Sequence, residues 1–131
     1  MIVIGVDVHK HSLTAVAVDQ AGRMLDEMTV AAADDELFVW AGGLDGERLW
    51  ALEDCRQLTR WLERLLLAAG EQLVRVPPKL MAPERRAGRA RGKSDPIDAL
   101  AVARAALREP GLSRPRSDEQ PFRELKLLVD H

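Results

Sequence analysis

The chain contains no tyrosine, only two phenylalanines and a single cysteine among its 131 residues. One cysteine cannot form an internal disulfide, which suits a reducing compartment such as the cytosol. So few aromatic rings give little support for a surface on which single-stranded bases stack. No apolar run approaches the roughly 20 residues that span a bilayer, and no positively charged leader precedes the first apolar run. The sequence therefore predicts a cytoplasmic protein without a membrane segment or signal peptide.

The net charge is also small, at −2, but the charged residues are distributed unevenly. Residues 79–93 hold six basic side chains against one acid, Glu84. Five of these basic residues, together with Lys10, are candidates for binding the phosphates of nucleic acid without sequence specificity. The five are Arg85, Arg86, Arg89, Arg91 and Lys93. The alternatives are a solvated basic loop and, for Lys10, an exposed lysine in a turn.

Hydrophobic patterning predicts an α/β domain with five strands. Short apolar or β-branched runs predict strands at residues 2–8, 13–19, 24–30, 48–53 and 72–76. Apolar residues three or four apart, with capping residues, predict helices at residues 36–41, 58–66 and 95–108. The first three strands form an antiparallel meander, and helical crossovers make the last two strands parallel to the first. This order is typical of a ribonuclease H-like fold, a mixed five-stranded sheet flanked by helices with the first strand at its centre.

The division of the chain follows from its prolines and its last apolar stripe. We expect the α/β domain to cover residues 1–108, because Pro110 and Gly111 end its last helix. Polar residues and further prolines predict a linker over residues 109–121. Residues 122–131 begin another amphipathic helix, which is too short to bury its apolar stripe alone.

Four acidic residues stand where such a fold can bring them together. Asp7 and Glu53 end the first and fourth strands, while Asp95 and Asp98 open the helix at residues 95–108. The carboxyl ends of parallel strands meet at one edge of a sheet, and a spacing of three puts two helical side chains on one face. Simpler interpretations are a turn residue for Asp7, a surface acid for Glu53 and a capping box for the aspartate pair.

Together the four carboxylates predict a site for divalent metal ions. Carboxylates that are brought together repel one another unless cations lie between them. Their hard oxygens suit Mg²⁺, with Mn²⁺ as a substitute, and two such ions about 4 Å apart stabilise charge on the attacking and leaving oxygens of a phosphodiester. His9 and His11 are a weaker candidate, for a transition metal, since histidines in a turn more commonly face solvent.

Three parts of the sequence resemble the DEDD-type transposases of bacterial insertion sequences. They are VDVHK at residues 6–10, Glu53 at the end of the fourth strand, and GKSDPIDA at residues 92–99. The resemblance covers residues 1–108 and implies the catalytic domain of that family, which is ribonuclease H-like and similar to Holliday-junction resolvases. It further implies that the four acids bind Mg²⁺ for the cleavage and transfer of DNA strands in transposition.

The resemblance also implies partners and further parts of the protein. DNA is the expected substrate, some family members are guided by an RNA, and a homo-oligomer is expected of the full-length protein. Family members carry a serine nucleophile in a C-terminal domain, whereas no serine of this chain lies in a matching context. We therefore expect the chain to be a fragment or a truncated remnant that is inactive, or cuts slowly, on its own.

Two other classes of protein share parts of the pattern. A nucleotide-binding domain of the actin or sugar-kinase type also opens with an apolar strand, an aspartate and a hairpin. That class needs a glycine-rich turn after the aspartate so that backbone amides can approach phosphate, but residues 9–12 contain no glycine. The second alternative is a non-catalytic remnant that only binds nucleic acid, and a test for Mg²⁺-dependent cleavage distinguishes it from a transposase.

Overall fold

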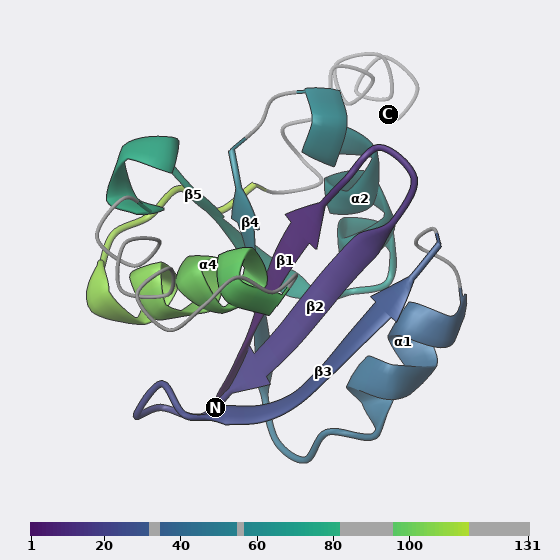
Figure 1. Ribbon diagram of the computed structural model, residues 1–131, viewed down its shortest axis with the longest axis horizontal. Helices are drawn as coiled ribbons and strands as arrows, with labels where there is room; N and C mark the ends of the chain where they lie inside the picture. The colour runs from purple at the N-terminus through teal and green to yellow at the C-terminus, as the bar shows by residue number, and fades with distance from the viewer. Residues whose placement is uncertain (32–34, 55–56, 82–95, 116–131) are drawn as a thin grey trace, which may run out of the picture.

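The computed structural model describes residues 1–31, 35–54, 57–81 and 96–115 of the chain (Figure 1). The strands in this part of the chain are β1 (Ile2–Val8), β2 (Leu13–Val18), β3 (Met24–Val30), β4 (Arg48–Glu53) and β5 (Gln72–Val76). The helical elements are α1 (Asp35–Gly42), α2 (Gln57–Ala68), the short 3-10 helix η1 (Pro78–Met81) and α4 (Pro96–Arg108). The strands predicted from the sequence agree with these bounds to within one residue.

The strands form one sheet in the order β3-β2-β1-β4-β5, so β1 is central. β1 pairs antiparallel with β2, and β2 with β3, while β4 runs parallel to both β1 and β5. This arrangement confirms the predicted mixed five-stranded sheet. Because α1 and α2 serve as the crossovers, the carboxyl ends of β1, β4 and β5 lie at the same edge of the sheet.

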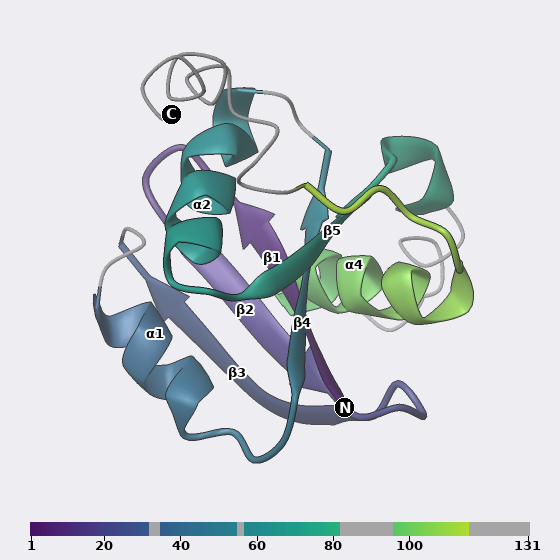
Figure 2. The same ribbon diagram turned by 180° about the vertical axis from the view of Figure 1, so that it is seen from behind.

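Helices cover both faces of the sheet, and alternation along each strand decides which layer a side chain joins. Ile4 and Val6 of β1 pack in an apolar layer with residues of α1 and α2. Val3 packs in a second layer with residues of α4. Figure 2 shows α1 and α2 in front of the sheet, and α4 beside the strands on its other face. The fully buried Trp50 of β4 belongs to the first layer.

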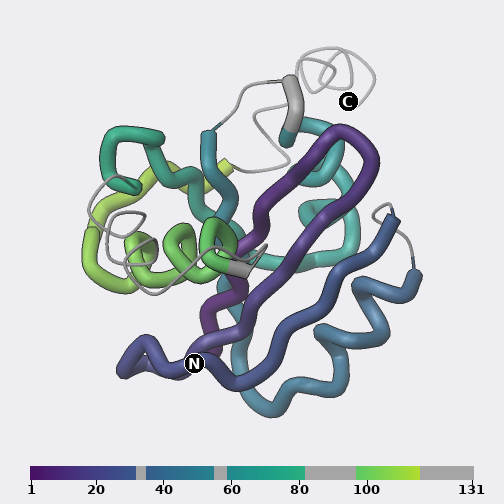
Figure 3. The backbone as a smooth tube through the Cα atoms, in the orientation of Figure 1, coloured from purple at the N-terminus to yellow at the C-terminus, as the bar shows by residue number. Residues whose placement is uncertain are grey.

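Gly5 of β1 allows α4 to pack directly on the backbone of the central strand. A Cβ atom at this position would lie 2.1 Å from the carbonyl oxygen of Ala99 and 2.6 Å from the amide nitrogen of Ala103. Both contacts are with backbone atoms, which cannot rotate away as a side chain can. The backbone trace shows the start of α4 next to β1 (Figure 3). The glycine therefore fixes how close the helix comes to the strand.

The turn between β2 and β3 is held by Asp19, as expected for the predicted hairpin. Its Oδ1 accepts hydrogen bonds from the amides of Ala21 and Arg23, each at 2.9 Å, and Gly22 adopts a φ of 83°. The bond from the Arg23 amide is the main reason that the pKa of the Asp19 carboxyl lies below its usual range. Arg104 Nε of α4 donates to the Gly22 carbonyl at 3.0 Å, so the turn is tied to that helix.

The amino end of β4 is joined to the start of β5 by three side chains, which we call the amino-end clamp: Arg48, Glu71 and Trp50. The Nη2 and Nε atoms of Arg48 donate to the two oxygens of Glu71 at 2.7 and 3.1 Å, and Trp50 Nε1 donates to Glu71 Oε1 at 2.8 Å. The hydrogen bonds from Arg48 lower the pKa of the Glu71 carboxyl, and those to Glu71 raise the pKa of the Arg48 guanidinium. The clamp therefore stabilises the ionised pair.

Residues 109–115, predicted as the first half of a linker, run along the outer edge of β5. The amide of Arg75 donates to the carbonyl of Ser113 at 2.8 Å, and Pro115 is buried. Residues 116–121 of the predicted linker and the helix predicted at 122–131 lie outside the described residues, so the division into parts stays a prediction. Among the helices that the structure describes, none combines the length and apolar character needed to cross a membrane.

Candidate active site

The carboxyl ends of β1 and β4 carry two acids in neighbouring register. The parallel ladder pairs Gly5 with Ala51, and both residues face α4. The ladder ends at the pair of Val6 and Leu52, and Asp7 and Glu53 are the next residues of the two strands. Alternation along each strand directs Asp7 to the face of Gly5 and Glu53 to the face of Ala51. Both carboxylates therefore belong to the face that α4 covers.

Asp7 is largely enclosed and lies against a histidine. Its side chain is 14% exposed, its Oδ2 atom is buried, and His9 Nε2 lies 2.9 Å from that oxygen. The amide of His9 donates to the Ser12 carbonyl at 2.8 Å, which closes the turn after β1. His9 was considered together with His11 as a metal-binding pair, but the turn places His9 against Asp7, while His11 is exposed. His9 is therefore a neighbour that can orient the carboxylate.

The first turn of α4 carries a third candidate acid. Asp98 lies in that turn, and its neighbour Ala99 has its carbonyl oxygen directly over Gly5. Gly5 is two residues before Asp7 and on the same face of β1, so the helix begins above the edge where the strand acids end. The amino end of a helix carries partial positive charge, which favours carboxylates nearby. Asp95 lies outside the described residues.

The donor atoms available here fit a hard divalent cation, because the candidate ligands are all carboxylate oxygens and one of them, Asp7 Oδ2, is buried. Within the described residues, no three histidine, cysteine, aspartate or glutamate side chains come together as a group that could hold a metal ion. The fold thus puts Asp7 and Glu53 at the carboxyl ends of neighbouring strands and the first turn of α4 over Gly5. The assignment of all four acids as metal ligands stays a prediction.

The basic residues predicted to contact nucleic acid are divided between two parts of the chain. Lys10 is exposed in the turn that follows β1, three residues after Asp7. It is thus at the carboxyl edge of the sheet, on the same side as the acids. The other five residues lie outside the described part of the chain. They are Arg85, Arg86, Arg89, Arg91 and Lys93.

A buried glutamate behind β4 was not identified from the sequence. Glu63 of α2 is only 3% exposed and forms ion pairs with Arg60 and Arg75 at 2.9 Å each. The signal that could have revealed it is its place next to Leu62 on the apolar stripe of α2, where an acid requires a buried partner. Its partner Arg75 comes from β5, and no local spacing in the sequence identifies that residue.

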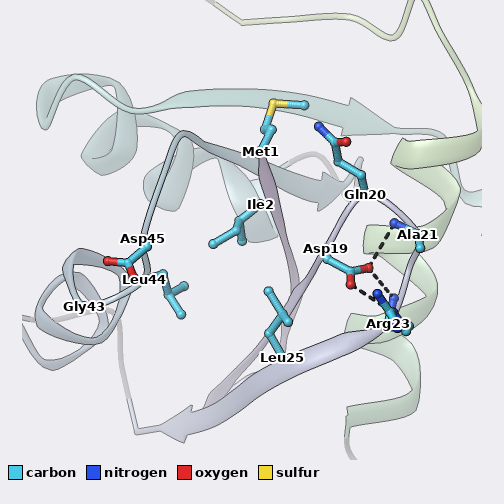
Figure 4. Close-up of a pocket in the computed structure, with 10 residues that line it drawn as sticks. All are labelled: Met1, Ile2, Asp19, Gln20, Ala21, Arg23, Leu25, Gly43, Leu44 and Asp45. Atoms are coloured by element: carbon cyan, nitrogen blue, oxygen red, sulfur yellow. Dashed lines mark hydrogen bonds and ion pairs between the residues drawn. The ribbon is translucent and has the colours of Figure 1, made fainter.

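A pocket of about 650 Å³ opens at the opposite end of β1 (Figure 4). Met1, Leu25 and Leu44 supply apolar atoms to it, and Asp19 and Arg23 line another wall. It lies at the amino end of the central strand, whereas the candidate ligands lie at the carboxyl end. The pocket is therefore separate from the acids and has no part in the site that they form.

Comparisons with known proteins agree with this fold and with the family suggested by the motifs. The family model of the DEDD transposases of IS110 elements, described as "Transposase", matches residues 4–131. Among solved structures, RuvC of T. thermophilus in complex with Holliday junction substrate is similar, with a TM-score of 0.57 and 17% identity. That match covers 88% of this chain and 99% of the RuvC chain, and it confirms the predicted ribonuclease H-like fold. No curated protein matches the sequence.

Proposed function

The chain belongs to the family of DEDD transposases, and on this premise we propose that it is the domain in which that family's phosphodiester chemistry takes place. In this proposal the chain binds DNA and holds Mg²⁺, or Mn²⁺ as a substitute, between Asp7, Glu53, Asp95 and Asp98. The reaction is the cleavage and transfer of DNA strands during transposition. The family match does not favour the alternative of a nucleotide-binding domain of the actin or sugar-kinase type.

The observation that carries the proposal is the register between β1 and β4. Asp7 and Glu53 directly follow the last pair of that ladder, Val6 and Leu52, and alternation assigns both side chains to one face of the sheet, where nearby carboxylates repel each other. A divalent cation bound between such carboxylates would lower this repulsion, which supports a metal site at this edge. The close packing of α4 on Gly5 supports the same proposal, because it brings the start of the helix that bears Asp98 to this edge.

Each group of the chain has a distinct part in the proposed reaction. The two strand acids are held by the sheet and define fixed positions for metal ligands, while Asp98 adds a ligand from α4. His9, 2.9 Å from Asp7 Oδ2, orients that carboxylate. When bound, the metal ions supply charge stabilisation at the attacking and leaving oxygens of the phosphodiester. Lys10 at the rim of the site contacts a phosphate of the substrate.

DNA is the proposed partner, for which two findings give support. The family is one of transposases, and the similar RuvC structure is a complex with Holliday junction substrate. The basic residues 85–93 supply the proposed contacts to phosphates, in a manner that does not depend on base sequence. A guide RNA and a homo-oligomer of the full-length protein remain predictions of the family resemblance.

Titration with Mg²⁺ and Mn²⁺ by calorimetry tests the metal site in the chain itself. We expect Asp7→Asn and Glu53→Gln to abolish measurable binding, because each removes a charged ligand while keeping the shape of the side chain. Asp19→Asn is the matched control, since this aspartate lies in the hairpin turn at the opposite end of the sheet. Equal affinity in all four proteins would contradict the proposal and favour a non-catalytic domain that binds nucleic acid.

A further inference from the structure

Ion pairs hold β4 at both ends, and the group at its carboxyl end adjoins Glu53. Arg75 of β5 donates from Nε and Nη2 to the two oxygens of Glu63, both at 2.9 Å. Arg60 of α2 donates from Nη1 to Glu63 Oε2 at 2.9 Å and from Nη2 to Asp54 Oδ1 at 3.1 Å. Asp54 is the residue that follows Glu53. We call Asp54, Arg60, Glu63 and Arg75 the carboxyl-end network.

Stability of the core does not account for this network. The Glu63 side chain is 4% exposed, and its carboxylate loses most of its hydration when the chain folds. Buried ion pairs of this kind can usually be replaced by apolar side chains of similar volume without loss of stability. Glu63 adjoins Leu62 on α2, where an apolar residue would extend the same layer. The network therefore calls for a role other than core packing.

The network acts on the backbone that carries Glu53. The amide of Asp54 donates to the Val76 carbonyl at 2.9 Å, which extends the pairing of Glu53 with Val76 in β5. The carboxylate of Asp54 is held by Arg60 on the face that α2 covers, whereas alternation directs the Glu53 side chain to the face that α4 covers. The end of β4 is thus fixed on the face that α2 covers, while the Glu53 side chain belongs to the opposite face, as does Asp7.

We propose that Arg60 is a positioning residue for Glu53, through its bridge from the buried Glu63 to Asp54. This inference rests on the metal site proposed above. The planar guanidinium presents Nη1 and Nη2 to two different carboxylates at once, and it links the rigid α2–β5 interface to the end of β4. A lysine ammonium lacks this fork and binds one of the two partners at a time. In this proposal the network holds Glu53 in the position at which it serves as a metal ligand.

The test combines three substitutions at two residues with one control. Arg60→Met and Arg60→Lys break the bridge at a residue whose side chain is 32% exposed, and Asp54→Ala removes the group that the bridge holds. The control is Glu71→Gln, which breaks the amino-end clamp at the other end of the same strand. The measurements are the affinity for Mn²⁺ by calorimetry, the amide hydrogen exchange of Asp54 without metal, and the melting temperature.

We expect both Arg60 variants to bind Mn²⁺ about tenfold more weakly, as is common when a group that orients a metal ligand is removed. The amide of Asp54 should exchange faster relative to the amides of β2. In an Asp54→Ala background, Arg60→Met should cause no further loss of affinity, because the link is already broken. Glu71→Gln should lower the melting temperature but leave the affinity and the Asp54 exchange unchanged.

Unchanged affinity and unchanged Asp54 exchange in Arg60→Met would overturn the positioning role. An equal loss of affinity in Glu71→Gln would also overturn it, since the effect would then follow from general destabilisation. A further loss of Mn²⁺ affinity from Arg60→Met in the Asp54→Ala background would contradict the inference that Arg60 acts on Glu53 through its ion pair with Asp54. Failure of the unsubstituted chain to bind Mn²⁺ would instead contradict the proposed function, and the exchange of the Asp54 amide would still show whether Arg60 anchors the strand.

Discussion

Gly5→Ala should displace α4 from the central strand β1 and thereby destabilise the protein. The added methyl group would lie 2.1 Å from Ala99 O and 2.6 Å from Ala103 N, whereas ordinary contacts begin at 3.4 Å. The helix must therefore move by about 1 Å, which breaks contacts in a layer that is close-packed. Overpacking of this kind costs about 3 kcal/mol, at the upper end of its usual range. With a typical urea dependence, the midpoint of unfolding should fall by about 1–2 M.

The matched control is Gly42→Ala at the end of α1, because nothing lies within 4 Å of a Cβ atom at that position. That change should leave the midpoint unchanged or raise it slightly, since alanine has the higher helix propensity. Urea unfolding followed by tryptophan fluorescence, to which the buried Trp50 contributes, measures both variants. A Gly5→Ala protein within about 0.5 kcal/mol of the unsubstituted chain would refute the close packing of α4 on β1, given the cost expected for overpacking. Under conditions where Gly5→Ala remains folded, its affinity for Mn²⁺ should also be reduced, because α4 bears Asp98.

Three further variants give independent tests. Glu71→Gln should cost about 2 kcal/mol at pH 7 by weakening the amino-end clamp. Because the folded pKa of Glu71 is lowered from 4.5, the clamp contributes fully above that value, and its contribution is lost as pH falls through the folded pKa. The unfolding curves of variant and parent should therefore converge in acid. Asp7→Asn should raise the metal-free melting temperature slightly, because it removes repulsion with Glu53, and a marked decrease would count against paired carboxylates. A quadruple alanine variant of the basic segment should bind DNA more weakly and with a smaller salt dependence, measured by fluorescence anisotropy, whereas an unchanged salt slope would exclude these residues from the contact. It replaces Arg85, Arg86, Arg89 and Arg91.

The sheet could be predicted from the sequence because its signals are local. Residues 2–8 and 48–53 are short apolar runs that end at turn or polar residues, so their bounds follow from composition. The parallel placement of β4 beside β1 follows from the helical crossover. The place of Asp7 and Glu53 at the carboxyl ends of neighbouring strands could therefore be expected from the order of elements, and their joint role as metal ligands stays a prediction.

The parts that could not be predicted depend on contacts between residues far apart in the chain. Glu63 of α2 forms an ion pair with Arg75 of β5, and no pattern along α2 identifies that partner. The packing of Ala99 over Gly5 depends equally on how a helix crosses a strand nearly a hundred residues earlier in the sequence. The neighbour of Asp7 was missed for a different reason. His9 is close in sequence, but only the geometry of the turn decides whether its ring points to solvent or back to the strand end.

The most direct test of the central claim is a strand-transfer assay on the protein as its gene encodes it, with Mg²⁺ present or replaced by a chelator, for the natural sequence and for Asp7→Asn. We expect transfer only with Mg²⁺ and only with Asp7 intact, while DNA binding stays largely unchanged in the variant because the basic segment is retained. Equal strand transfer by Asp7→Asn would contradict the assignment of the carboxylates at the ends of β1 and β4 as the metal site.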